Sequence, residues 1–315
     1  MSLPEVLGQE AALTRLARML ERRRVPSALL FYGPDGVGKR LSARLFAAAL
    51  ECERDAELQT QPSGGLPFCG VCAACASVLK RAHPNVLEVD DAFQAAVLEE
   101  EVEKQKSLRV DTARELTRLA SLKTTGGRWK VFILDNAHRL EPQAANALLK
   151  ALEEPAPDTV WILIAPRRES LLATVQSRCQ PVAFRALNTE VLLKVLAREN
   201  LLSAEEARRW TPAAEGSLSR AVLLSRFGAL VDGARGGAAY WQASQSLPRE
   251  LAQAREAVDG ALEALLAETR ENLRSPGAAA ARAAELMKLK RALRANVSPQ
   301  LILQLALLKT EGARA

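Results

Sequence analysis

The sequence is poor in aromatic residues and contains no long apolar run. Aromatic side chains make up 4% of its 315 residues. No stretch approaches the roughly 18 consecutive apolar residues of a transmembrane helix. The N-terminus shows no charged segment followed by an apolar one, as a secretion signal would. We therefore expect a cytoplasmic protein that neither spans a membrane nor is secreted.

Charge and length set wide limits on function. The formal net charge is +6 and the isoelectric point is near 9.2, which tolerates a nucleic-acid partner without requiring one. The arginine clusters at 22–24, 167–168 and 208–209 contain no aromatic residue, so we expect solvated faces there. A chain of 315 residues with 48% hydrophobic content has room for two or three domains.

The stretch GPDGVGKR, residues 33–40, is typical of a phosphate-binding loop. It follows an apolar run at 28–32 and precedes a helical pattern, which gives the order strand, glycine loop, lysine, helix. Gly33, Gly36 and Gly38 let backbone N–H groups converge on an anion, and the helix N-terminus adds its positive end. Lys39 supplies a charge for the terminal phosphates. The alternative, a chance glycine loop, fits the flanking segments less well.

Three polar groups expected of a working nucleotide site are missing. Position 40 is normally Ser or Thr, whose hydroxyl holds Mg²⁺, but here it is Arg40, which cannot coordinate a metal. Asp135 ends the apolar run 130–134 and is placed to hold that metal, yet Asn136 follows where a glutamate would activate water. The strand at 159–164 leads into Ala165 instead of a polar residue that senses phosphate. The sequence predicts an NTPase fold with a damaged site, which makes ATP or ADP binding doubtful.

Four of the five cysteines form a second pattern, at Cys52, Cys69, Cys72 and Cys75. Three cysteines at intervals of three residues can converge on a tight turn, and Cys52 can complete a tetrahedron. Four thiolates leave no open position on Zn²⁺, so we expect a structural zinc site. Disulfides, which need an oxidising compartment, and free thiols are the alternatives. His83 is a conceivable ligand, and Cys179 is expected to be a buried apolar residue.

Periodicity and breakers predict a three-part chain: an α/β parallel-sheet P-loop domain at 1–186 with a zinc module at about 52–80, a helical lid at 187–230 and an all-α collar at 231–315. We expect three interruptions in this chain: an insertion at 57–67, a charged and partly mobile segment at 94–106, and a linker at 232–237. The last helix, 299–308, could cover a partner subunit or an internal core. Predicted helices are 3–24, 39–52, 109–122, 141–154, one from about 170, 190–200, 204–210, 217–227, 251–273, 278–295 and 299–308; predicted strands are 28–32, 86–89, 130–135, 159–164 and 181–184.

The motifs, in this order and spacing, resemble the bacterial clamp-loader ATPases of the AAA+ group. GPDGVGKR, the four-cysteine module, LDNAHRL, NALLKALEEP and SRCQ carry the resemblance, which covers at least residues 1–225. The glycine loop alone does not identify a family. The zinc module after the loop's helix, together with SRC, is specific to clamp-loader subunits. The family implies a five-subunit ring, held by a C-terminal collar, that opens a sliding clamp and places it on primed DNA.

Within this family, the chain resembles the non-hydrolysing δ′ type of subunit of DNA polymerase III rather than the γ or τ motor. Motor subunits have Thr after the loop lysine and a DEAH-like box, so Arg40 and Asn136 are departures that match the δ′ role. The resemblance implies that Arg178, in SRC, is an arginine finger that reaches the γ-phosphate held by an adjacent motor. An ordinary surface arginine is the alternative. The implied partners are the γ or τ and δ subunits, the sliding clamp transiently, and primer–template DNA through the complex.

Two other functions are compatible with the residues. A γ-like ATPase would turn over Mg²⁺-ATP despite Arg40. A stand-alone zinc-bearing DNA-binding protein would bind DNA tightly as a monomer, with a strong dependence on salt.

Overall fold

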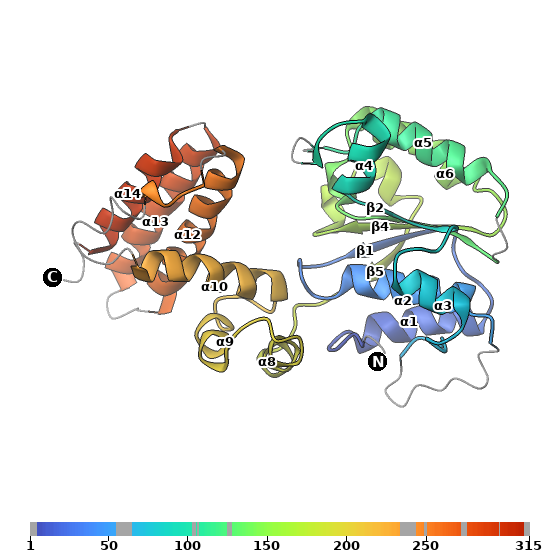
Figure 1. Ribbon diagram of the computed structural model, residues 1–315, viewed down its shortest axis with the longest axis horizontal. Coiled ribbons are helices and arrows are strands. Elements are labelled where there is room, and N and C mark those ends of the chain that lie inside the picture. The colour runs from blue at the N-terminus through green and yellow to red at the C-terminus, as the bar shows by residue number, and fades with distance from the viewer. Residues whose placement is uncertain are drawn as a thin grey trace. The chain divides into compact units, whose positions relative to one another are not determined.

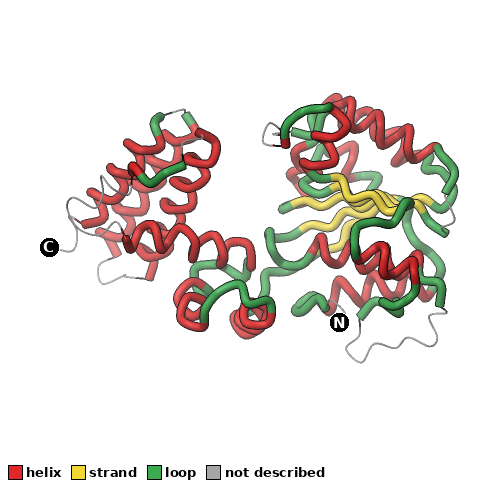
Figure 2. Tube along the Cα trace, viewed as in Figure 1, coloured by secondary structure: helices red, strands yellow, loops and turns green. Residues whose placement is uncertain are grey.

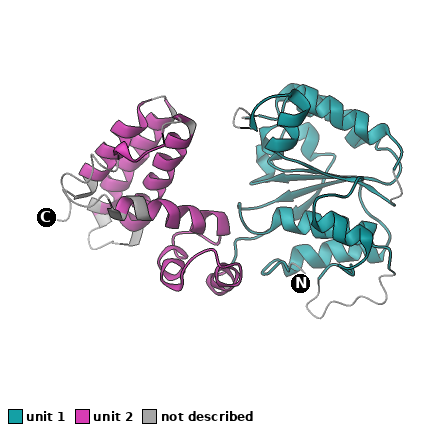
Figure 3. Cartoon of the chain, in the orientation of Figure 1, with its two compact units in different colours: residues 1–187 teal, residues 188–315 magenta. Residues whose placement is uncertain are grey.

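The computed structural model describes residues 5–54, 65–102, 105, 107–124, 128–233, 244–248, 251–271, 276–295 and 297–311. The chain divides into two compact units, Met1–Leu187 and Asn188–Ala315 (Figure 3). Most of the predicted insertion at 57–67 and of the predicted linker at 232–237 lies outside the described residues. The two described residues of that linker, 232 and 233, end a helix instead.

The N-terminal unit contains a five-stranded parallel sheet, drawn in yellow in Figure 2. Its strand order is β2-β3-β4-β1-β5. Because the strands are parallel, their carboxyl ends lie along one edge of the sheet, where ligands of α/β folds bind. The strand bounds are β1 Ala28–Tyr32, β2 Val86–Val89, β3 Lys130–Leu134, β4 Thr159–Ala165 and β5 Gln180–Ala183.

Helices cover both faces of this sheet (Figure 1). Helices α1, α2 and α3 lie on one face, and α4, α5 and α6 lie on the other. The short α7 follows β4 along the chain. The helix bounds are α1 Glu10–Glu21, α2 Lys39–Glu51, α3 Ala73–Leu79, α4 Asp91–Leu98, α5 Val110–Ser121, α6 Pro142–Glu153 and α7 Ala173–Gln176.

Strands β1, β3 and β4 are buried on both faces, which explains their continuous apolar sequences. Alternate residues point to the same face, so Leu30 of β1 and its register partner Leu163 of β4 share one core cluster with Leu116 of α5 and Leu148 of α6. Phe132 and Trp161 stack there with ring centroids 4.3 Å apart. This packing fixes the sheet edge that carries the candidate site.

Two predicted segments differ from the structure. The predicted helix 3–24 begins at Glu10, because the buried Gln9 side chain is tied to the backbone of Arg185, donating to its carbonyl oxygen and accepting from its amide at 2.8 and 3.0 Å. The segment 94–106, predicted to be charged and partly mobile, starts inside α4, and its residues 103, 104 and 106 lie outside the described residues. There Gln94 is fully buried, and its Nε2 atom donates to Gln105 at 2.7 Å.

The C-terminal unit is helical and has one shared apolar core. Phe227 of α10 packs directly on Gly260 of α12, where a Cβ atom would lie 2.0 Å from the ring. Leu286 and Ile302 complete this core from α13 and α14. The division into a lid and a collar stays a prediction within this unit. Its helices are α8 Thr189–Arg198, α9 Ala204–Trp210, α10 Leu218–Gly233, α12 Leu251–Glu271, α13 Pro276–Arg294 and α14 Pro299–Glu311.

The last helix, α14, supports the internal-core alternative for part of its surface. Ile302, Leu303 and Leu307 are buried in the unit's own core, whereas Leu301 and Leu308 are 48% and 54% exposed. None of the described helices is long and apolar enough to cross a bilayer.

Candidate functional site

The glycine loop lies between β1 and α2, at the carboxyl edge of the sheet. Gly33 leaves β1 with φ +148, and its amide donates to the carbonyl oxygen of Ala165 at 3.3 Å. A Cβ atom at Gly33 would lie 2.2 Å from the carbonyl oxygen of Phe184, so only glycine fits. Gly38 then caps α2 in the left-handed region, with φ 98 and no side-chain hydrogen bond. The first amides of α2 are therefore open toward the loop.

Lys39 is the first residue of α2, and its amine is folded over the loop. The side chain is 6% exposed, and Nζ donates to the carbonyl oxygens of Gly33 at 2.5 Å and Pro34 at 2.6 Å. Asp35 is 3.3 Å from the same nitrogen. Burial lowers the pKa of Lys39 below its ordinary value, and the Asp35 carboxylate offsets this in part. The amine is thus held by carbonyl oxygens of the loop itself.

Arg40, the second residue of α2, contacts three carboxylates. Nε donates to Glu88 at 3.1 Å, Nη2 to Asp90 at 2.9 Å and Nη1 to Asp135 at 3.4 Å. Glu88 and Asp90 lie at the end of β2, and Asp135 follows the neighbouring β3. Burial opposes the charge of Arg40, but Glu88 and Asp135 outweigh it and raise its pKa. The side chain is thus held across the ends of two adjacent strands.

Two more arginines complete this ion-pair network around Glu88. Arg44, one turn further along α2, donates from Nε to Glu88 at 2.5 Å, and Arg81, just after α3, lies 3.2 Å from the same carboxylate. Arg81 also approaches Asp90 at 3.7 Å. Burial favours the neutral acid, yet the bonds and charges of the three arginines lower the pKa of Glu88 below its ordinary value. We call Arg40, Arg44, Arg81, Glu88, Asp90 and Asp135 the arginine network.

The residues after β3 and β4 are those that the sequence marks as altered. Asn136 is exposed and adopts φ 53, so position 136 presents an amide and no carboxylate. Ala165 ends β4 and is 1% exposed, so the sheet edge beside the loop is apolar there. An amide cannot accept a proton at neutral pH, and the site therefore lacks a general base at this position.

His138 is a site residue that sequence reasoning treated only as part of the LDNAHRL motif. Its Nδ1 atom is one of the few buried polar atoms among the described residues that lack a hydrogen-bond partner. Burial is the largest cause that lowers its pKa, and Asp35, Asp135 and Lys39 also act on the ring. A cavity of about 230 Å³ is lined by His138, in the 3-10 helix η3 (Ala137–Arg139), together with residues of the 3-10 helix η4 (Arg168–Ser170) and of α7. The sequence contains only two histidines, and this rarity was the signal that could have marked His138 as a candidate site residue.

Arg178 lies just after α7, at the surface of the N-terminal unit. Its side chain is 32% exposed. Nε donates to Glu153 Oε1 at 2.6 Å and Nη1 to the carbonyl oxygen of Thr174 at 2.7 Å, while Nη2 also pairs with Glu153. The guanidinium is therefore held outside the core by exposed partners that another anion could replace. Cys179, the next residue, is buried as predicted, and burial raises the pKa of its thiol to about 12.

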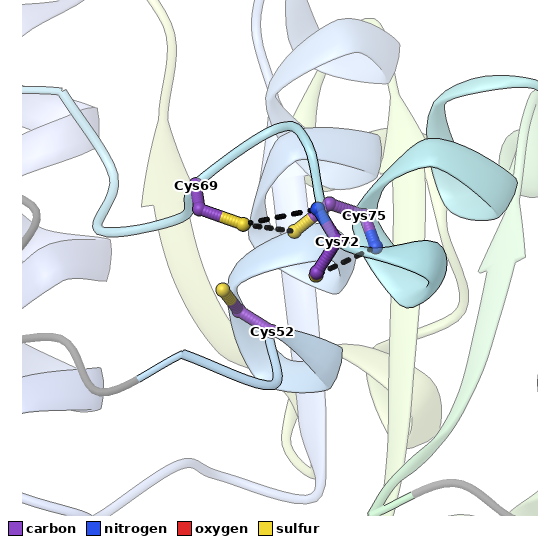
Figure 4. Close-up of side chains that lie close together, drawn as sticks. All are labelled: Cys52, Cys69, Cys72 and Cys75. Carbon is purple, nitrogen blue, oxygen red and sulfur yellow. Dashed lines mark hydrogen bonds between the residues drawn. The ribbon is translucent and has the colours of Figure 1, made fainter.

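The four predicted cysteines come together at the C-terminal end of α2 (Figure 4). Cys52 caps α2, Cys69 precedes α3, and Cys72 and Cys75 lie at its N-terminus. Their sulfur atoms all lie within 4.8 Å of one another, and none forms a disulfide. His83 lies apart from them: its Nδ1 accepts from the amide of Asn85 at 3.3 Å, and its Nε2 is 3.7 Å from Glu51.

These thiols fit a metal ion. A tetrahedral Zn²⁺ with Zn–S bonds of about 2.3 Å places sulfurs about 3.8 Å apart, and Cys69 Sγ lies 4.0 Å from Cys75 Sγ. The amides of Cys72 and Cys75 donate to the sulfurs of Cys69 and Cys72 at 3.3 and 3.4 Å. Burial opposes the Cys69 thiolate, but hydrogen bonds from Val71, Cys72 and Cys52 lower its pKa to about 6. This donor set suits a closed metal site.

Comparison with known proteins agrees with this geometry. Residues 8–188, more than half of the chain, match the family model described as DNA polymerase III, delta subunit. The chain belongs to this family. The predicted membership of the DNA polymerase III clamp-loader family of AAA+ proteins is thereby confirmed.

Named relatives include two kinds of subunit. The DNA polymerase III subunit delta' of Pseudomonas aeruginosa is 38% identical over 183 residues, 57% of this chain and 50% of the relative. Subunit tau of Escherichia coli is 33% identical over 226 residues, 70% of this chain and 32% of the relative. The match thus spans from 32% to 50% of the length of these curated relatives.

A solved structure supports the fold. The DNA polymerase III gamma subunit-related protein from Thermotoga maritima superposes with a TM-score of 0.55 at 18% identity, and the match covers 95% of this chain and 97% of that one. The fold is an α/β AAA+ domain followed by a helical C-terminal region, as predicted.

Proposed function

We propose that this chain is a non-hydrolysing, δ′-type subunit of the DNA polymerase III clamp loader in the cytoplasm. It scaffolds a ring with γ or τ and δ subunits, through a helical collar at 231–315 that follows a lid at 187–230. It supports loading of the sliding clamp onto primed DNA. Its own glycine loop, Gly33, Gly36, Gly38 and Lys39, is a degenerate nucleotide site.

The proposal that this chain does not hydrolyse ATP rests on one observation. The Asp135 carboxylate, which would help to hold Mg²⁺ in a working site, is paired with the guanidinium of Arg40 at 3.4 Å. The neighbouring position offers the amide of Asn136 instead of a base. Phosphoryl transfer depends on positioning and on charge stabilisation by the metal, so these two changes together remove the main contributions to the rate.

Arg178 is the residue that would act on a neighbour. Its guanidinium lies at the surface, and its partner Glu153 is 47% exposed, so the pair is weakly held. A γ-phosphate on an adjacent subunit would be a stronger, bidentate partner for a guanidinium than a solvated carboxylate. Charge that develops on the transferring phosphoryl group would then be stabilised by an arginine supplied in trans.

The cysteine cluster would hold one structural Zn²⁺ ion. Its four ligands, Cys52, Cys69, Cys72 and Cys75, leave no open coordination position for substrate. Bound zinc would tie the end of α2 to α3, which already touch where the Cys75 thiol donates to the carbonyl oxygen of Ala48 at 3.6 Å.

The test is ATP hydrolysis by a reconstituted loader that contains Arg178→Ala. We expect the chain to fold and assemble, and the DNA-stimulated rate to fall by about 10³-fold or more, as for other arginine fingers. Arg178→Lys keeps the charge but loses the planar fork, and should recover only part of the rate. Arg118→Ala, which removes an exposed arginine of α5 paired with Glu115, is the matched control. An unchanged rate in the Arg178→Ala loader would refute the finger assignment.

A further inference from the structure

The second residue of α2 places a permanent positive charge at the carboxylate that metal-dependent P-loop enzymes reserve for Mg²⁺. We propose that the Arg40 guanidinium takes the place of a divalent metal ion at Asp135, so that the glycine loop binds nucleotide phosphates without metal. This inference rests on the proposed function in one respect, namely that the loop is a nucleotide site that no longer hydrolyses.

The position of Arg40 is the first argument. In metal-dependent P-loops the residue after the lysine supplies a hydroxyl to Mg²⁺, and an aspartate after a neighbouring strand completes the site. Here the same two positions are joined directly, because Arg40 Nη1 lies 3.4 Å from Asp135 Oδ2. Nη2 reaches Asp90 at 2.9 Å at the end of the adjacent strand. The carboxylates available to a metal are thus already engaged by a cation.

The charge balance of the arginine network is the second argument. Three guanidinium groups, from Arg40, Arg44 and Arg81, face three carboxylates, so the formal charges cancel. A divalent ion would add two positive charges beside Arg40 and would have to displace it from Asp135. Like charges this close repel, and a hydrated Mg²⁺ gives up its water reluctantly. The network therefore disfavours the metal.

The remaining donor of Arg40 is the third argument. A guanidinium carries five N–H groups. Nε and Nη2 both lie 3.1 Å from Glu88 Oε2, Nη2 also donates to Asp90, and Nη1 donates to Asp135. The second N–H of Nη1 remains for a phosphate oxygen, which guanidinium groups bind well. Arg40 can thus bridge a carboxylate and a phosphate as a metal ion does. Lys39 and the open amides of α2 provide the other phosphate contacts without any metal.

The matched control is on the same helix. Arg44 also carries one positive charge, and both its Nε and its Nη2 atoms contact Glu88. Replacing either arginine by threonine removes the same charge from α2. Only the change at position 40 restores a hydroxyl next to Lys39 and frees Asp135.

The experiment measures the dissociation constant of a fluorescent ADP analogue for the full chain, in excess Mg²⁺ and in EDTA. The wild-type constant should change by less than about twofold between the two conditions, whereas Arg40→Thr should bind at least about tenfold more tightly with Mg²⁺. Arg44→Thr leaves Asp135 paired with Arg40, so its dissociation constant, whatever its value, should also change by less than about twofold between Mg²⁺ and EDTA. Arg40→Lys, which keeps the charge, should also ignore EDTA, and it serves if Arg40→Thr does not fold by circular dichroism.

Three results would overturn the inference: wild-type binding that is lost in EDTA, equal insensitivity of Arg40→Thr, or no wild-type binding at millimolar ADP. The proposed function fails by a separate readout, namely ATP turnover by the isolated chain. Either can therefore fail while the other stands.

Discussion

Helix α2 carries a candidate site at each end, and the two ends differ in how much of an ordinary site they keep. At its C-terminal end, Cys52 joins three other cysteines whose sulfurs lie within 4.8 Å of one another. At its N-terminal end, Lys39 and three glycines keep the shape of a phosphate loop, but Arg40 replaces the metal-binding hydroxyl and pairs with Asp135.

The difference lies in what each end needs in order to be held together. A closed four-thiolate site needs every ligand, because each missing thiolate leaves an open position on the metal. At the glycine loop, the guanidinium of Arg40 supplies the positive charge that a metal ion would bring. The carboxylates are therefore paired without a metal. On the proposed account, a metal ion added to the chain would hold the first end, whereas ion pairs within the chain hold the second. The experiments below act on one end at a time.

The largest expected effect is at the cysteine end. Cys72→Ser should release one metal ion per chain and lower the midpoint of thermal unfolding by about 10 °C or more, because metal binding at such sites contributes directly to folding. Elemental analysis and circular dichroism measure both changes. Cys179→Ala is the control, since that buried cysteine lies outside the cluster. A wild-type protein purified without metal, or a variant that keeps it, would contradict the zinc assignment.

An intermediate effect is expected at the loop end, without any metal. Glu88→Gln leaves three arginines around a neutral amide and should cost about 3 kcal/mol of unfolding free energy at pH 7. The pKa of Glu88 lies below its ordinary value of 4.5 in the folded state. Its stabilisation is therefore present above about pH 4.5 and is lost as the pH falls through the lower folded-state pKa.

Urea unfolding of the wild type and the variant at pH 7 and pH 3 measures this dependence. The two proteins should differ much less at pH 3 than at pH 7. Glu115→Gln on the exposed face of α5 is the control, because its partner Arg118 is solvated and little stability should change. A pH-independent difference between wild type and Glu88→Gln would show that packing, and not charge, explains the role of Glu88.

The smallest effect is a repair of the altered loop. Arg40→Thr combined with Asn136→Glu should improve Mg²⁺-ATP binding or turnover beyond either single change, with a coupling of about 0.5 kcal/mol or more, because metal and base act on the same reacting group. Titration of ATP and single-turnover assays on the three variants measure this coupling. No gain in ATP affinity or turnover would mean that other defects dominate, such as the apolar exit of β4 at Ala165.

Much of the N-terminal unit could be predicted because its signals are local. The strands 28–32 and 86–89 have the bounds that the apolar runs predict, and cysteine spacing alone brings Cys52 next to Cys69, Cys72 and Cys75. Long-range pairing was not predictable in this way. Hydrogen bonds with the backbone of Arg185 hold the Gln9 side chain outside the predicted first helix. Gln94 lies in a segment predicted from its charges to be partly mobile, and it is buried by hydrogen bonds with Gln105 and Thr112.

The site shows the same limit. Sequence comparison marks Arg40 as a departure, but not where its side chain goes, because Glu88 and Asp90 come from a strand whose place beside β3 depends on the fold. The buried Nδ1 of His138 is likewise visible only once η3, η4 and α7 enclose it. Partners that are distant in sequence thus decide how a changed motif behaves.

The most direct test of the account is phosphate release from ATP by the purified chain alone, in excess Mg²⁺, beside the same chain assembled with a motor subunit. The account predicts no release above background for the chain alone, and DNA-stimulated release from the assembly that depends on Arg178. Sustained multiple turnover by the isolated wild-type chain would contradict it.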